Sequence, residues 1–163
     1  MSARNDAETP NPATLVGRIK GALSVWVQDV EIERGEASAA LSFTHPVHGA
    51  TVMVVADAGE PDADPVVPPG VGIFVVLGDF EPIVGDRAAL AGLFGLNARL
   101  MSCAVGLLPL NEDELATALC RRLPAADFDV AGVRELIDAM IWEYASCAGF
   151  LRGDAAEAPA AEA

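Results

Sequence analysis

The feature that most constrains the fold is one apolar stripe near the end of the chain. Between residues 129 and 151, apolar side chains recur at helical spacing, at Val133, Leu136, Ile137, Met140, Ile141, Tyr144, Ala148 and Leu151. This spacing predicts a long amphipathic helix with Asp129 as its N-cap. Because such a helix buries its stripe against another layer, the rest of the chain must supply that layer.

Four segments upstream have the composition of strands. Residues 28–33 alternate apolar and polar side chains, and residues 37–44, 51–56 and 71–77 are apolar and rich in extended-chain formers. Short breaks separate the first three segments, which favours antiparallel pairing. A long loop with four prolines, residues 57–70, precedes the fourth segment.

Cap signals predict two more helices. Asn11 followed by Pro12 begins the first, over residues 12–25. Its apolar stripe consists of Leu15, Ile19, Leu23 and Trp26. Asp86 begins the second helix. One face of that helix carries Leu90, Leu93, Phe94 and Asn97.

The segment between the second and the last helix contains two further elements. Residues 99–108 are predicted as a strand, which Pro109 ends. Asn111 with Glu114 three residues later has the pattern of a capping box and predicts a short helix over residues 112–123. A hairpin strand is the alternative there.

These elements predict one α+β domain over residues 11–151. Their order is helix, three or four antiparallel strands, helix, strand, short helix and long helix, with the helices packed on the sheet. Residues 1–10 are polar, and residues 152–163 are a low-complexity Ala/Glu/Pro segment. We expect both to be disordered tails.

The chain is strongly acidic, with a formal net charge of −14. Such a field repels phosphate backbones and anionic lipid, so we expect neither a nucleic acid nor a membrane surface as partner. The three cysteines, Cys103, Cys120 and Cys147, include no CxxC pair. Their odd number favours reduced thiols and a cytoplasmic location. We also expect no signal peptide and no membrane-spanning helix.

No catalytic or phosphate-binding motif is readable in the sequence. The chain lacks GxxxxGK[ST], a GxGxxG after a strand, HExxH and GxSxG. The only histidines, His45 and His48, lie in a predicted turn with Pro46. We interpret them as solvent-exposed loop side chains rather than metal ligands. We therefore expect no enzyme activity, no metal and no cofactor.

Two surface features indicate a partner. Trp142 lies on the face of the last helix opposite the apolar stripe, beside the polar residues Glu135 and Asp138. Either a partner or another part of the same chain covers an aromatic side chain in such a place. In the predicted strand 99–108, small side chains occupy one face and would let a helix or a second subunit approach closely. The other face carries Met101, Cys103, Val105 and Leu107.

Several segments between Val75 and Leu151 match the layout of a known family. VVLGDFEPI has the form of a third strand, and LAGLFGLNARL that of a second helix ending in a Leu-Asn pair. MSCAVGLLPLNEDELATALCRRL and FDVAGVRELIDAMIWEYASCAGFL have the form of the strand, the helical turn and the closing helix that follow. Together they resemble the class I type III secretion chaperones and the related YbjN-like proteins. The loop 57–70 and the lack of a clear hairpin after Leu108 depart from that pattern.

The resemblance implies a homodimer that binds an extended segment of a protein client and needs no cofactor. The second helix and the strand after it would form the dimer contact, through Leu90, Leu93, Phe94 and Met101. The first helix and first strands would receive the client, through Leu15, Ile19, Val30, Ile32 and Val52. Because Trp142 lies on the polar face of the last helix, we also expect it to contact the client.

Two functions of other classes stay open on the sequence alone. One is an acidic inhibitor or immunity-type protein that masks a basic effector, which the net charge of −14 would suit. The other is a small-molecule sensor or enzyme that uses a pocket under the loop 57–70.

Overall fold

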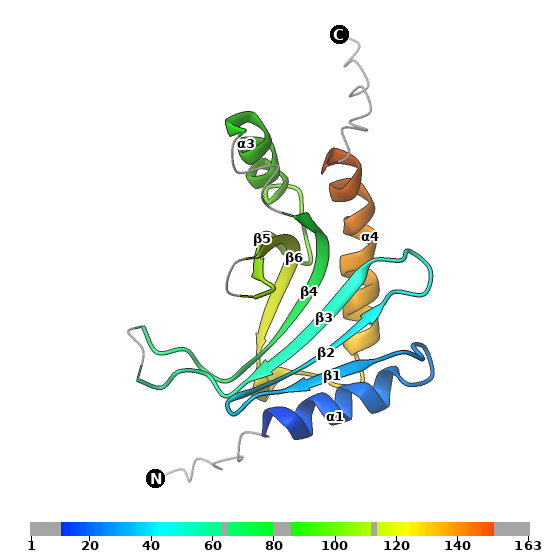
Figure 1. Cartoon of the computed structure of the whole chain (residues 1–163), viewed down its shortest axis with the longest axis vertical. Coiled ribbons are helices and arrows are strands. Elements are labelled where there is room, and N and C mark those ends of the chain that lie inside the picture. Colours follow the sequence, from blue (N-terminus) through cyan, green and yellow to red (C-terminus); the bar gives the residue numbers. More distant parts are fainter. Residues whose placement is uncertain (1–10, 63–64, 80–85, 112–113, 152–163) are drawn as a thin grey trace.

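The computed structural model describes residues 11–62, 65–79, 86–111 and 114–151, and these form one α+β domain. Figure 1 shows a curved sheet with helices beside it. The helices are α1 (Pro12–Leu23), α3 (Arg87–Leu96) and α4 (Val133–Leu151), with a 3₁₀ turn at Ala125–Asp127. The strands are β1 (Glu31–Arg34), β2 (Ser38–Thr44), β3 (Thr51–Asp57), β4 (Gly70–Asp79), β5 (Ala104–Pro109) and β6 (Leu115–Pro124).

The six strands form a single antiparallel sheet in the order β1-β2-β3-β4-β6-β5. The first four strands are neighbours in sequence and in space. β6 lies between β4 and β5, so the last hairpin joins the sheet through its second strand. β1 and β5 are therefore the two edges of the sheet.

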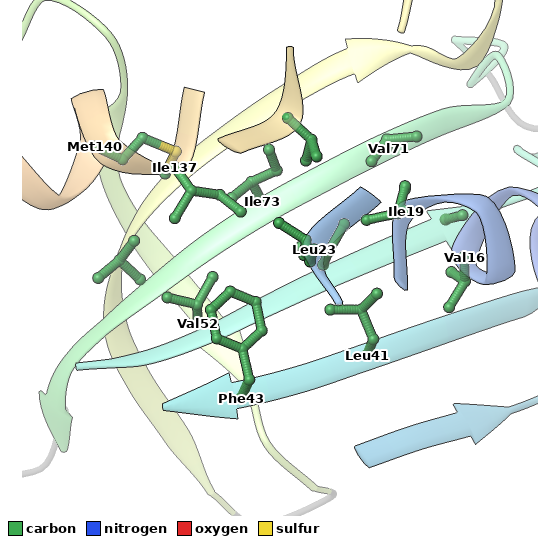
Figure 2. Close-up of a cluster of buried hydrophobic side chains, with 14 of the residues drawn as sticks. Val16, Ile19, Leu23, Leu41, Phe43, Val52, Val71, Ile73, Ile137 and Met140 are labelled. Atoms are coloured by element: carbon green, nitrogen blue, oxygen red, sulfur yellow. The ribbon is translucent and has the colours of Figure 1, made fainter. Parts of the chain in front are cut away.

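The core lies between the sheet and the helices α1 and α4. β2 and β3 bury every second residue, as strands with one covered face do. Figure 2 shows side chains of α1, β2, β3, β4 and α4 pointing toward one another. The residues labelled there, all buried, are Val16, Ile19, Leu23, Leu41, Phe43, Val52, Val71, Ile73, Ile137 and Met140.

The sequence predicted the α+β class and most of the elements correctly. α1 begins at Pro12 behind the Asn11 cap, whose side chain accepts a hydrogen bond from the Ala13 amide at 2.9 Å. Asp86 accepts from the Ala88 amide at 2.8 Å at the start of α3. In α4 the stripe is confirmed where its side chains are described. Val133, Ile137, Met140 and Ile141 are buried, and Leu136 and Tyr144 are half-buried.

The short helix predicted over residues 112–123 is wrong, because this segment contains strand β6. β6 pairs with β4 on one side and with β5 on the other, so backbone hydrogen bonding on both sides overrides its helical spacing. The Asn111–Glu114 contact does form. Asn111 accepts from the Glu114 amide at 3.0 Å, but the contact closes the β5–β6 hairpin instead of capping a helix.

Several predicted boundaries also need correction. α1 ends at Leu23 instead of residue 25, and β1 begins at Glu31 instead of residue 28. The strand expected over residues 99–108 begins only at Ala104, and its predicted alternation fails because Leu107 is exposed and Leu108 is buried. Asp129 does not cap α4, which begins at Val133. Its carboxylate accepts from the Ala131 amide at 3.0 Å, in the turn before the helix.

The predicted tails 1–10 and 152–163 lie outside the described residues, as does the segment 80–85 before α3. Among the helices that are described, none combines the length and hydropathy needed to cross a membrane.

Candidate functional site

An open pocket of about 370 Å³ lies where the β1–β2 ladder ends. It is lined by Trp26, Val27, Gln28, Asp29, Thr44 and Pro46. If the register of β1 and β2 continued past Glu31, Asp29 would face Thr44 and Val27 would face Pro46. The pairing ends at Glu31 and Ser42, and beyond it Val27 is buried in the core and Pro46 has no amide hydrogen with which to resume the ladder. The separated chains leave the pocket between them.

Trp26 is held in this pocket by contacts on several sides. α1 ends at Leu23, and the Trp26 amide donates to the Leu23 carbonyl at 2.8 Å. The indole meets the Phe43 ring edge-on at 6.0 Å between centroids and the His45 ring at 5.0 Å. The Arg134 guanidinium, from α4, lies 5.2 Å from the indole centroid. Trp26 is therefore a positioned aromatic wall with part of its surface open.

His45 lies behind the pocket and is only 3% exposed, so the prediction of a solvent-exposed loop histidine is wrong for this residue. Its Nδ1 accepts hydrogen bonds from the amides of Val47, at 3.4 Å, and His48, at 3.2 Å. Nε2 faces the Asp138 carboxylate at 3.6 Å. Burial lowers the pKa of His45, and although Asp138 raises it, the net direction is down.

The outer surface around the pocket combines apolar and acidic side chains. Val25 and Val47, next to the lining residues Trp26 and Pro46, are 97% and 76% exposed. Asp29 and the two glutamates of β1 are also exposed. Apolar groups beside carboxylates can bind a segment that has both apolar and basic side chains.

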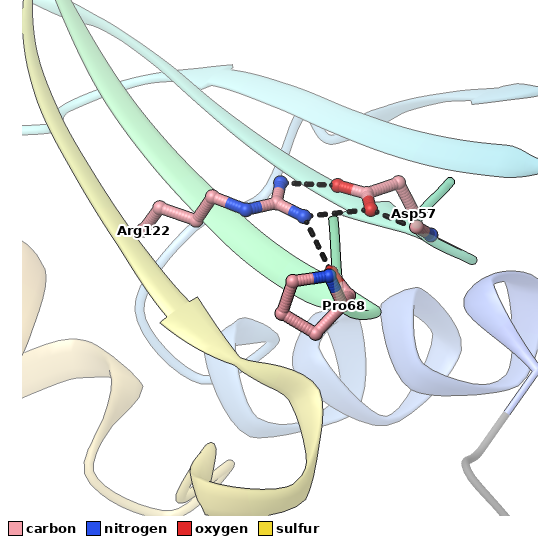
Figure 3. Close-up of polar contacts among 4 residues, drawn as sticks. Asp57, Pro68 and Arg122 are labelled. Atoms are coloured by element: carbon pink, nitrogen blue, oxygen red, sulfur yellow. Dashed lines mark hydrogen bonds and ion pairs between the residues drawn. The ribbon is translucent and has the colours of Figure 1, made fainter. Parts of the chain in front are cut away.

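A second polar cluster holds the base of the loop between β3 and β4. Figure 3 shows the Arg122 guanidinium bound to both carboxylate oxygens of Asp57, with its Nη2 also 3.0 Å from the Pro68 carbonyl. Arg122 holds the pKa of Asp57 below its usual value. Gly59 has φ +72°, and a Cβ there would lie 2.3 Å from the Val67 carbonyl oxygen. These contacts use the charged groups for structure, so they do not favour the sensor hypothesis for this loop.

A third cluster connects α4 to the turn before β5. The Glu143 carboxylate accepts from the amides of Met101 and Ser102, the Ser102 hydroxyl and the Cys103 thiol. Burial raises the pKa of Glu143, but these hydrogen bonds outweigh it and lower the pKa overall. These hydrogen bonds to Glu143 hold residues 101–103 in a bend, which explains why the strand predicted from residue 99 begins only at Ala104.

The predicted client-binding residues do not form one surface. Leu15, Ile19 and Val52 are fully buried in the core, so a client cannot reach them while α1 stays on the sheet. That part of the prediction is corrected, because the same apolar stripe serves to attach α1. Val30, just before β1, and Ile32, within it, are half-buried and lie closest in sequence to the pocket. Trp142 is 84% exposed on α4, as its position opposite the stripe predicted.

The predicted dimer residues also separate into two groups. Leu93 is buried and Leu90 half-buried, so both contribute to the packing of α3 in the protomer. Phe94 belongs to α3, but its side chain is outside the described part of the structure. Met101 is 94% exposed, on the turn that Glu143 holds from the position next to Trp142.

The sequence reasoning missed the pocket itself. Trp26 was assigned to the apolar stripe of a helix, although the helix ends three residues earlier. Two sequence features could have indicated the pocket. Pro46 after His45 and the polar Gln28 and Asp29 after Trp26 are residues that favour the end of a strand pairing. For metal binding, the described residues contain no group of three or more His, Cys, Asp or Glu side chains placed to hold an ion.

Comparisons of the chain with protein-family models and with curated proteins found no match. The chemistry of the pocket and of the sheet edge beside it is therefore what can indicate a function.

Proposed function

We propose that this protein is a non-catalytic, chaperone-like protein that binds an extended segment of a protein client. The observation that carries the proposal is the Trp26 pocket at the end of the β1–β2 ladder, next to the sheet edge β1. A segment added beside β1 would gain backbone hydrogen bonds, and an apolar side chain could enter the pocket. Among the described strands, none lies on the outer side of β1.

The charge of this region defines the client further. Asp29, Glu31 and Glu33 are exposed beside the pocket, and the chain has a net charge of −14. A client segment that alternates apolar and basic residues would place one set in the pocket and along Ile32, and the other against these carboxylates.

The order of the elements supports the same proposal. β5 and β6 form a hairpin that turns just after Leu108. The secretion-chaperone and YbjN-like pattern has a hairpin at this point, although none was clear from the sequence. The proposal accordingly includes a homodimer and a cytoplasmic location. Light scattering on the purified protein checks the first, with a mass of twice 16.9 kDa expected.

The direct test uses a short fluorescein-labelled peptide in which valine and lysine alternate around one phenylalanine. We expect saturable binding, weakened at least about tenfold by Trp26→Ala, because anchoring aromatics dominate such interfaces. Trp142→Ala is the matched control, since it removes the other tryptophan from an exposed helix position. Equal binding by both variants would exclude the pocket.

A second peptide separates strand addition from simple charge attraction. Proline at every other position removes the amide donors needed beside β1 but leaves the lysines in place. We expect this peptide to bind much more weakly. If it binds as well as the first, and both lose affinity steeply with salt, the acidic-mask function explains the data better.

A further inference from the structure

His45 connects the wall of the Trp26 pocket to α4. Pro46 lines the pocket, and the turn that follows it is held by two hydrogen bonds to a single atom, the His45 Nδ1. The turn is also closed by backbone bonds from the Gly49 amide to the His45 carbonyl, at 2.9 Å, and from the His45 amide to the Ala50 carbonyl, at 2.8 Å. The position of this pocket wall therefore depends on what the His45 ring can accept.

The two hydrogen bonds define the protonation state of the ring. Because Nδ1 accepts from two amides, it carries no proton, so the neutral ring has its hydrogen on Nε2. A second proton would have to bind Nδ1 and would point at the Val47 and His48 amides. Three donors would then share a site with no acceptor, and the turn could not keep its geometry.

The charged groups around His45 come from two elements. Asp138 on α4 faces Nε2 and favours a positive ring, but it is also 3.6 Å from Arg134, which shares its charge. In the turn, the His48 ring is 5.4 Å away and disfavours a positive charge on the His45 ring, which lowers the pKa of His45. Burial of the His45 ring opposes protonation most strongly, and the pKa lies below the usual value of 6.5.

We propose that protonation of His45 opens the 45–49 turn and releases the segment bound at the Trp26 pocket, so that the site holds its client at neutral pH and frees it in mild acid. This inference depends on the proposed function for the identity of the ligand. The opening of the turn does not, because it follows from the hydrogen bonds of His45 alone. The closed turn binds fewer protons than the open one, so acid favours the open state.

The opening is tested without any ligand by amide hydrogen exchange measured by NMR. Exchange rates are corrected for their intrinsic pH dependence and compared at about pH 7.5 and about pH 5, a range that spans histidine titration. We expect the protection factors of the Val47 and His48 amides to fall at least about tenfold in acid, because the loss of one net hydrogen bond changes an opening equilibrium by about that factor. The Val105 amide, bound to Asn97 at the far edge of the sheet, serves as the internal control and should keep its protection.

His45→Asn supplies the decisive variant. Its side-chain oxygen can replace Nδ1 as the acceptor for the two amides, but it does not titrate. We expect the two amides to show the same protection at both pH values in this variant, while His48→Asn retains the wild-type pH response. Unchanged protection of Val47 and His48 in the wild-type protein would overturn the proposal, whatever the variants do.

Binding of the valine–lysine peptide at the two pH values tests the release step. The measurement uses a Trp142→Phe background, in which Trp26 is the only tryptophan and reports the pocket directly. We expect affinity to fall at least about tenfold in acid with His45 and to stay constant with His45→Asn. Opening of the turn without peptide binding at any pH would contradict the proposed function alone. Binding with no change in affinity between the two pH values would contradict the proposed release on protonation of His45 and leave the proposed function intact.

Discussion

The two edges of the sheet end in different ways. At the β5 edge, the Asn97 side chain accepts from the Val105 amide at 2.5 Å and donates to the Val105 carbonyl at 3.4 Å, and α3 packs beside the strand. At the other edge, β1 is only four residues long, three of them charged, and ends at an open pocket. Natural sheets protect exposed edges by covering them or by making them short and charged. Both edges are therefore protected, the β5 edge by a covering side chain and helix and the β1 edge by its short length and its charges, and under the proposed function the carboxylates of β1 would admit a basic segment.

The largest expected effect tests whether a client would bind at the edge of β1 or on the face of the sheet that α1 covers. Ile19 is fully buried under the sheet, so Ile19→Asp places a carboxylate in the core and should cost about 4 kcal/mol or more. Denaturant unfolding followed by circular dichroism measures the loss. A variant that folds with near wild-type stability would show that α1 leaves the sheet readily and would restore Ile19 as a client contact.

The next prediction opens the covered edge. Asn97→Leu removes both hydrogen bonds to Val105 and should lower the free energy of unfolding by about 2 kcal/mol. The uncovered β5 should also promote self-association, which sedimentation velocity detects. Asn97→Asp is the matched control, because it keeps the acceptor for the Val105 amide and should retain more of the stability.

A smaller effect is expected at the turn that leads into β5. Glu143→Gln weakens four hydrogen bonds to residues 101–103 and should cost about 1–2 kcal/mol at neutral pH. Because the folded pKa of Glu143 is lowered, its contribution is present above the ordinary value of 4.5 and is lost as the pH falls through the folded value. Stability measured as a function of pH should therefore lose part of its acid dependence in Glu143→Gln. If the free energy of unfolding depended on pH identically in both proteins, the hydrogen bonds of Glu143 to residues 101–103 would not contribute to stability.

The smallest effect belongs to the β1 edge itself. Glu33→Lys changes an exposed charge on a strand with one partner, so stability should stay within about 0.5 kcal/mol. Its affinity for the valine–lysine peptide should nevertheless fall, because a repulsive charge replaces an attractive one. Equal affinity would mean that the acidic edge does not select the client, and the contrast between the two edges would then be one of length alone.

Local patterns predicted much of the fold, and tertiary pairing decided the rest. The stripe at Val133, Ile137 and Met140 predicts α4 because only a helix places those residues on one face. Leu115 and Leu119 have the same four-residue spacing, yet they lie in β6, where two neighbouring strands supply the backbone partners. A sequence window does not contain those partners, so propensity alone favours the wrong element.

The candidate site was harder to predict than the fold for a related reason. Its parts come from the residues after α1, the residues after β2 and the first half of α4, and Trp26 lies more than a hundred residues before Arg134 in sequence. His45 looked exposed because a proline turn usually lies at the surface, but α4 and Trp26 cover it. Trp142 was placed correctly because its exposure depends only on its position around one helix.

The ion pair at the base of the β3–β4 connection has a consequence for engineering. In Figure 1 the connection projects away from the rest of the domain, and a bridge between Glu60 and Val67 holds its two sides together. Below that bridge, Arg122 attaches Asp57 and Pro68 to β6, and β3 and β4 remain paired from Asp57 to Val52. Continuity of the chain beyond the bridge is therefore not needed to keep the strands together. A reporter domain or a new pair of chain termini could be placed there without disturbing the β1 edge proposed to bind the client.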